Sequence, residues 1–122
     1  MPVIDFRPQE AAGAEIVAMV LRDRGDAVRA GAVDELILRI GELVRARDAP
    51  AHLLAPAAAA VGDRAQALGL YRVARVARTI GVLAHGRDRA ALAANVARLI
   101  RLGDEILTEL DTMLAGRPPN SG

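Results

Sequence analysis

The chain has no cysteine and no lysine, and it has very few aromatic residues. Its 122 residues include 16 basic side chains, all of them arginine. The lack of cysteine excludes disulfides, thiolate metal ligands and cysteine nucleophiles, and it fits the cytoplasmic location that we expect. Because Phe6 and Tyr71 are the only aromatic residues, the core must be built from aliphatic side chains.

Signals for membranes and nucleic acids are weak as well. No window approaches the roughly 18 uncharged apolar residues of a membrane span, and the first residues lack the pattern of a secretion signal. Fifteen acidic residues nearly cancel the arginines and leave a net charge of +1, whereas nucleic-acid binding relies on a positive surface. We therefore expect no membrane and no nucleic-acid partner. The arginine and alanine content resembles the codon usage of a GC-rich bacterial genome.

Apolar residues recur at helical spacing along most of the chain, which predicts an all-α protein. The expected helices run from Gln9 to Gly25, from Val33 to Arg47, from about Pro50 to Leu68, from Leu70 to Ala84, and from the cap Asp88 to Gly116. Short links between long helices favour antiparallel neighbours. We expect an antiparallel up-down four-helix bundle with an additional N-terminal helix, as a single domain over residues 1–116, and a disordered tail over 117–122.

Several residues are typical of helix ends. Asp48 and Asp88 are candidate N-caps, and Gly86 is a candidate left-handed C-cap. Pro50 fits the first turn of the third helix. Pro56 is different, because proline inside a helix costs about 3 kcal/mol. The third helix is therefore expected either to bend at Pro56 or to begin there.

The last helix has the clearest pattern, a heptad seam in alternating steps of four and three residues. The seam consists of Leu92, Val96, Leu99, Gly103, Ile106, Leu110 and Met113, and Ile100, Leu107 and Leu114 are expected to widen it. Gly103 would let another backbone approach closely. Because the apolar faces are more extensive than one bundle needs, a homodimer is possible.

The usual catalytic motifs are absent from the sequence, and it has just two histidines, His52 and His85. We expect no cofactor and no metal, since Asp104, Glu105, Glu109 and Asp111 match a solvated helix face. For His85, next to Gly86, we expect a favourable interaction with a helix C-terminus. On the fourth helix, Arg72, Arg75 and Arg78 form a stripe beside Tyr71. This stripe is a candidate docking surface for an acidic partner.

In the second half of the chain, from about Ala49 to Leu114, His52 is followed by Leu53 and, ten positions on, by Gly62, and the turn Gly86-Arg87-Asp88 precedes the last helix. This pattern resembles the histidine-containing phosphotransfer (Hpt) family of two-component signalling. Hpt domains present a histidine on an antiparallel bundle, followed by a small residue, a glycine, an amphipathic helix, a Gly-Asp turn and a long last helix. Here His52 is followed by Pro56 where the small residue is expected, and by Gly62. The resemblance implies that His52 accepts a phosphoryl group, for which an imidazole with a pKa of about 6.5 is suited.

A second register of the same resemblance uses Gly69 as the motif glycine. The phosphorylation position then falls on Ala59, and Asp63 replaces the small residue. A chain in this register would be a degenerate Hpt relative that cannot carry phosphate. The two registers differ by seven residues, close to two helical turns, so helical periodicity does not separate them.

The resemblance implies a phosphotransfer protein that relays a phosphoryl group through His52, or that binds a receiver or kinase domain as a degenerate member. Its partners would be a response-regulator receiver domain or a sensor kinase. At most it would be a phosphotransfer intermediate with no independent catalytic activity. The alternative is a helical adaptor or a dimerising structural bundle that works by packing on a partner.

Overall fold

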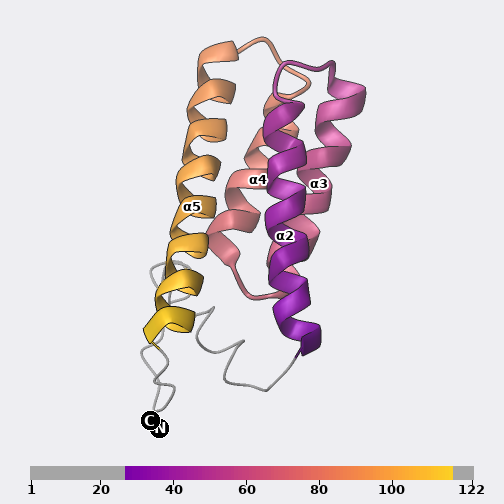
Figure 1. Ribbon diagram of the computed structural model, residues 1–122. Helices are drawn as coiled ribbons and strands as arrows, with labels where there is room; N and C mark the ends of the chain where they lie inside the picture. The colour runs from indigo at the N-terminus through magenta and orange to yellow at the C-terminus, as the bar shows by residue number, and fades with distance from the viewer. Residues whose placement is uncertain (1–26, 117–122) are drawn as a thin grey trace, which may run out of the picture.

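The computed structural model describes residues 27–116 and contains four helices in that range. They are α2 (Ala27–Arg45), α3 (Ala51–Ala67), α4 (Tyr71–Leu83) and α5 (Arg89–Gly116). Helix α3 packs on α2 and α4, and α5 packs on α4 and α2, so the four helices lie side by side around one core (Figure 1). The all-α prediction is confirmed for this part of the chain. The predicted helix from Gln9 to Gly25 and the predicted tail lie outside the described residues.

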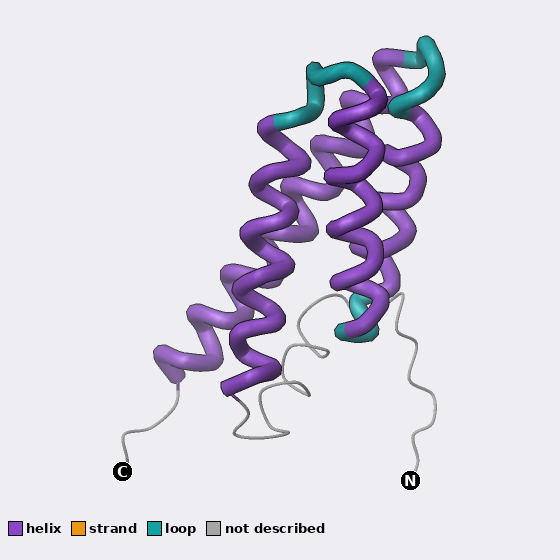
Figure 2. Tube along the Cα trace, turned by 90° about the vertical axis from the view of Figure 1, so that its right-hand side faces the viewer, coloured by secondary structure: helices purple, strands orange, loops and turns teal. Residues whose placement is uncertain are grey.

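The helices are joined by three short loops, residues 46–50, 68–70 and 84–88. The first and third loops lie at one end of the bundle and the second lies at the opposite end (Figure 2). Loops this short leave successive helices next to each other. The ends of α3 and α4 that face the first and third loops are therefore close neighbours.

Helix α2 begins six residues earlier than the apolar pattern predicts, at Ala27 in place of Val33, and it ends at Arg45 in place of Arg47. The added residues, 27–32, are rich in alanine, which favours a helix without contributing to an amphipathic stripe. A search for periodic large side chains therefore misses them. The prediction for α4 is confirmed to within one residue at each end.

The start of α3 differs from the prediction. Pro50 occupies the N-cap position, and no side chain caps the helix. Asp48 was predicted as the cap and is not; its carboxylate lies 3.7 Å from the guanidinium of Arg89. Pro56 neither begins the helix nor ends it, since α3 continues through it to Ala67.

A glycine does adopt a left-handed conformation in the described chain, but it is Gly69 and not Gly86. Gly69 has φ of 78°, and the amide of Leu70 donates to the carbonyl of Ala65 at 2.9 Å, which gives α3 a Schellman-type end. Helix α4 instead ends at Ala84 in a right-handed conformation. The prediction for Asp88 is confirmed, because its Oδ1 accepts a hydrogen bond from the Ala91 amide at 2.9 Å.

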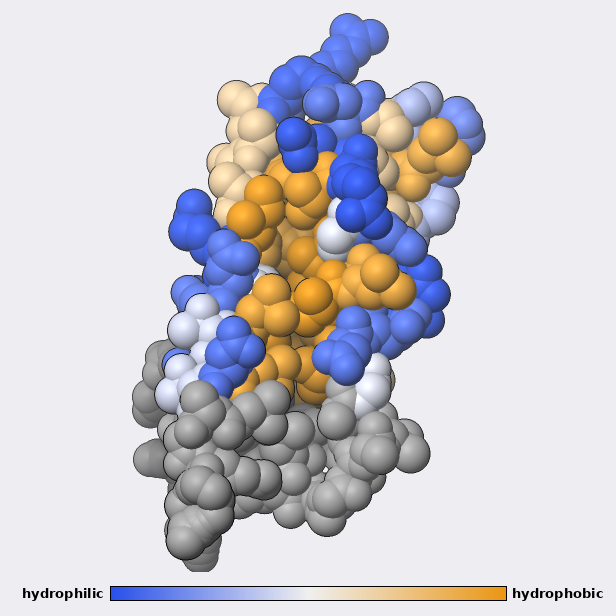
Figure 3. All heavy atoms as spheres, in the orientation of Figure 1, coloured by the Kyte–Doolittle hydropathy of each residue, from blue (hydrophilic) through white to orange (hydrophobic). Residues whose placement is uncertain are grey.

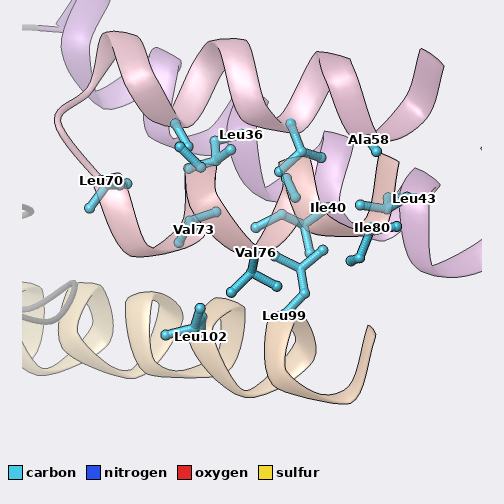
Figure 4. Close-up of a cluster of buried hydrophobic side chains, with 14 of the residues drawn as sticks. Leu36, Ile40, Leu43, Ala58, Leu70, Val73, Val76, Ile80, Leu99 and Leu102 are labelled. Carbon is cyan, nitrogen blue, oxygen red and sulfur yellow. The ribbon is translucent and has the colours of Figure 1, made fainter. Parts of the chain in front are cut away.

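The core is aliphatic, as expected, and no polar side chain is buried among the residues that the structure describes. Side chains from all four helices meet in it, including Leu36, Ile40, Val73, Val76, Ile80, Leu99 and Leu102 (Figure 4). The predicted seam of α5 is buried from Leu92 to Ile106. Two of the residues expected to widen it, Ile100 and Leu107, are instead 39% and 42% exposed, because no described element covers that side of α5.

Candidate functional site

The most closely packed pair of helices, α3 and α4, meets through small residues. A Cβ atom added to Gly81 would lie 3.7 Å from Cβ of Ala58, and one added to Gly62 would lie 3.9 Å from Cβ of Ala77. Both contacts are ordinary van der Waals distances, so the two backbones approach closely. The small side chains leave the outer side of this contact hollow.

That hollow is a groove of about 460 Å³ between α3 and the C-terminal half of α4. It is lined by Ala55, Ala59, Gly62, Asp63, Ala77, Arg78, Gly81, Val82 and His85. The residues from α3 are spaced by three and four, so they form one stripe along that helix. Alanine and glycine at these positions give the groove an apolar floor, and charged side chains stand at its margins.

A second hollow of about 400 Å³ adjoins the groove on α4 and shares Arg78 and Val82 with it. Its other lining residues are Gln66, Tyr71, Arg75 and Thr79. Val82 is 74% exposed, the highest value among the large apolar residues found exposed in the described chain. Val82 therefore stands where the two hollows meet. We call the two hollows together the α3–α4 face.

The arginines of α4 have no carboxylate partner within the described residues. Arg78 donates a hydrogen bond to Oε1 of Gln66 at 3.2 Å, and no ion pair within those residues involves Arg72 or Arg75. Three exposed guanidinium groups on one helix create a positive potential that attracts an acidic surface.

Arg39 of α2 provides a contrast. Arg39 pairs with Glu35 at 2.7 Å and with Glu42 at 2.9 Å, and Glu35 also pairs with Arg64 of α3 at 3.5 Å. The hydrogen bond to Glu42, together with the negative charge of Glu35, raises the pKa of the Arg39 guanidinium above its ordinary value. The positive charge of Arg39 is therefore neutralised within the molecule, whereas the described residues provide no such partner for the arginines of α4.

His52 is exposed and is the second residue of α3, in the first turn. His52 lies three positions before Ala55, so it continues the stripe of α3 residues that lines the groove. Its ring therefore lies beyond the end of the groove and not at its centre. The central position on α3 is occupied by Ala59, which has no nucleophile, with Asp63 one turn further on.

The structure brings together some of the predicted site residues and separates others. Tyr71, Arg75 and Arg78 line one hollow, whereas Arg72 is exposed but lines neither. His85 lines the groove just after the end of α4, although the sequence indicated only a helix-end interaction for it. Its proximity to α3 follows from antiparallel packing, which no local pattern reveals. The signal that was available is the coincidence of glycine and alanine at matching spacings on two consecutive helices.

Within the residues that the structure describes, no three histidine or acidic side chains come together to hold a metal ion. Among those residues, no helix combines the length and the apolar character needed to cross a membrane. No protein-family model, curated protein or solved structure matches the chain. The properties of the α3–α4 face are therefore inferred from its own geometry.

Proposed function

We propose that this protein is an Hpt-like docking module that binds an acidic partner domain, a response-regulator receiver or a sensor kinase, on the α3–α4 face. The observation that supports the proposal is the combination on this face of an apolar groove, an exposed Val82, and Arg75 and Arg78, which have no carboxylate partner among the described residues. An apolar centre with a charged margin is the usual design of a protein interface.

The degenerate form of the Hpt resemblance agrees best with the position of the groove. In that register the phosphorylation position is Ala59 and the neighbouring position is Asp63, and both line the groove. A partner seated there would meet no nucleophile at the centre. Binding without phosphoryl transfer is thus the principal proposal.

Phosphoryl transfer through His52 is the second candidate, favoured by one observation. The ring is exposed, and it belongs to the same stripe of α3 as Ala55 and Ala59. A partner extending past the end of the groove would reach it. The nitrogen lone pair of the neutral ring would attack the phosphorus of an acyl phosphate, and the aspartate carboxylate of the partner would leave.

Titration of the full-length protein against a panel of receiver and kinase domains tests the docking proposal. The variant Ala59→Trp fills the groove, and the double variant Arg75→Glu and Arg78→Glu reverses its charge. We expect each to weaken binding about tenfold or more, the second through a lower association rate that depends strongly on salt. Isothermal titration calorimetry measures the affinity.

Matched controls place the same changes on the exposed side of α5. Ala97→Trp and the double variant Arg98→Glu and Arg101→Glu alter exposed residues away from both hollows and should leave binding unchanged. Equal loss of binding in the α5 variants, or unchanged binding in the α3 and α4 variants, would refute docking at this face.

Incubation with a phosphorylated receiver domain separates the two forms of the proposal. Hydroxylamine-sensitive label that disappears in His52→Gln indicates the relay form. Binding without label indicates the degenerate form. The control His85→Gln changes the other histidine, which is expected to contribute to docking but not to accept phosphate.

We further propose that the whole chain has an up-down arrangement with an additional N-terminal helix. The alternating positions of the three loops support the first part (Figure 2). The alternative function, an adaptor or a dimerising structural bundle, would use the exposed apolar residues of α5 in place of the α3–α4 face.

A further inference from the structure

A second surface of the bundle is apolar and lies between α2 and α5. Figure 3 shows apolar side chains gathered in a band between these two helices, with hydrophilic residues on both sides. Beneath this band the two helices are in contact, and a Cβ atom added to Gly103 of α5 would lie 3.6 Å from Cγ2 of Ile40 of α2. Helices α2 and α5 contact each other much less extensively than α3 and α4 do.

The two margins of this band have matching patterns. On α5, Ile100 and Leu107 are seven residues apart and 39% and 42% exposed. On α2, Ile37 and Val44 are also seven residues apart, and they pack against the core without being fully buried. Residues seven apart lie on one face of a helix. The four side chains therefore form two apolar rows, one on each helix. We call the surface between these rows the α2–α5 groove.

We propose that residues 9–25 of this chain dock as a helix in the α2–α5 groove. The segment leads directly into Ala27, where α2 begins, and the end of α5 lies at the same end of the bundle (Figure 1). A turn at Gly25 would return the segment along the groove, antiparallel to α2. Its 17 residues would span about 25 Å as a helix, nearly the length of the 19-residue α2.

The apolar pattern of residues 9–25 is suited to docking in the α2–α5 groove. Ile16, Met19 and Val20 follow the spacing of one helix face, and Glu15 and Arg22 lie off that face. Docking this face would cover the half-exposed aliphatic side chains of both rows. Removal of apolar surface from water is the main source of favourable free energy in helix packing.

The tether favours this segment over a second copy of the chain. A short covalent link gives a bound segment an effective concentration in the millimolar range. A second molecule at micromolar concentration has to compete with that value. The inference does not depend on which partner binds the α3–α4 face.

Disulfide trapping in the full-length protein tests the proposal, and the native chain contains no cysteine that would interfere. Ile40 lies level with Gly103, so counting back from the turn at Gly25 places Ile16 beside Leu107 and Gln9 beside Ile100. The double variants Ile16→Cys with Leu107→Cys, and Gln9→Cys with Ile100→Cys, are oxidised under mild conditions. The control is Ile16→Cys with Glu105→Cys, because Glu105 is exposed on the opposite side of α5.

We expect both test pairs to form intramolecular disulfides at least tenfold faster than the control pair, visible as a faster-migrating monomer on a non-reducing gel. Disulfide-linked dimers in place of monomers would show that a second copy occupies the groove, and the proposal would be wrong. Equal rates in the test and control pairs, or no disulfide at all, would also overturn it.

Discussion

The two helix pairs that close the bundle are built from different side chains. Helices α3 and α4 meet through Ala58, Ala77, Gly62 and Gly81, and their backbones are close together. Helices α2 and α5 meet through Ile40 against Gly103, and larger aliphatic residues stand on both sides. The width of each contact follows from side-chain volume, since interiors pack to a uniform density.

The difference in packing produces two surfaces of different chemistry. The close α3–α4 contact leaves a shallow groove beside exposed arginines, which suits a folded partner with an acidic surface. The open α2–α5 contact leaves a band of apolar side chains, which suits an apolar helix face. We therefore propose that the same four-helix arrangement provides one face for an external partner and another for a further helix of the same chain.

The largest effect is expected from removing the side chain that bridges α2 and α5. Ile40→Ala should lower the free energy of unfolding by roughly 2–5 kcal/mol, because it leaves a cavity above Gly103. Leu38→Ala, on the same helix, changes a residue that is 52% exposed and should alter stability by less than about 0.5 kcal/mol. Urea denaturation followed by circular dichroism measures both. Similar losses in the two variants would mean that Ile40 does not bridge the helices.

A smaller loss is expected from enlarging a side chain between α3 and α4. Ala77→Leu should destabilise the protein by about 1–3 kcal/mol, since Ala77 is fully buried and faces Gly62 across the contact. The matched substitution Ala97→Leu, on the exposed side of α5, should be close to neutral. If thermal unfolding shows that Ala77→Leu is tolerated equally well, small residues do not set the spacing of α3 and α4.

Much of the fold could be predicted from the sequence, because large apolar side chains at helical spacing mark the faces that enter the core. The seam from Leu92 to Ile106 and the boundaries of α4 follow from this pattern. Helix ends were less predictable. Asp48 lies near Arg89 and does not cap α3, and the left-handed glycine of the described chain is Gly69, after α3, and not Gly86, after α4.

The candidate site could be predicted only in part. Arg75, Arg78 and Tyr71 were identified because a charged stripe is visible in one helix. The sequence did not predict that His85 and Ala59 line the same groove, because they belong to different parts of the chain and are brought together only by antiparallel packing. The exposure of Ile100 depends in the same way on what lies beside α5, which no local pattern contains.

The smallest effects are expected from replacing glycine by alanine at two positions, where the change in the free energy of unfolding should have opposite signs. Gly81→Ala should stabilise the protein by about 0.5–1 kcal/mol, because alanine favours a helix interior and the new methyl group would lie 3.7 Å from Ala58. Gly69→Ala should destabilise it by about 1 kcal/mol, because φ of 78° is unfavourable for a side chain with Cβ. Thermal unfolding of both variants beside the native protein measures the difference. A loss of stability in Gly81→Ala would indicate that α3 and α4 are already too close to accept a methyl group. Side-chain volume alone would then not explain why this contact is tighter than the one between α2 and α5.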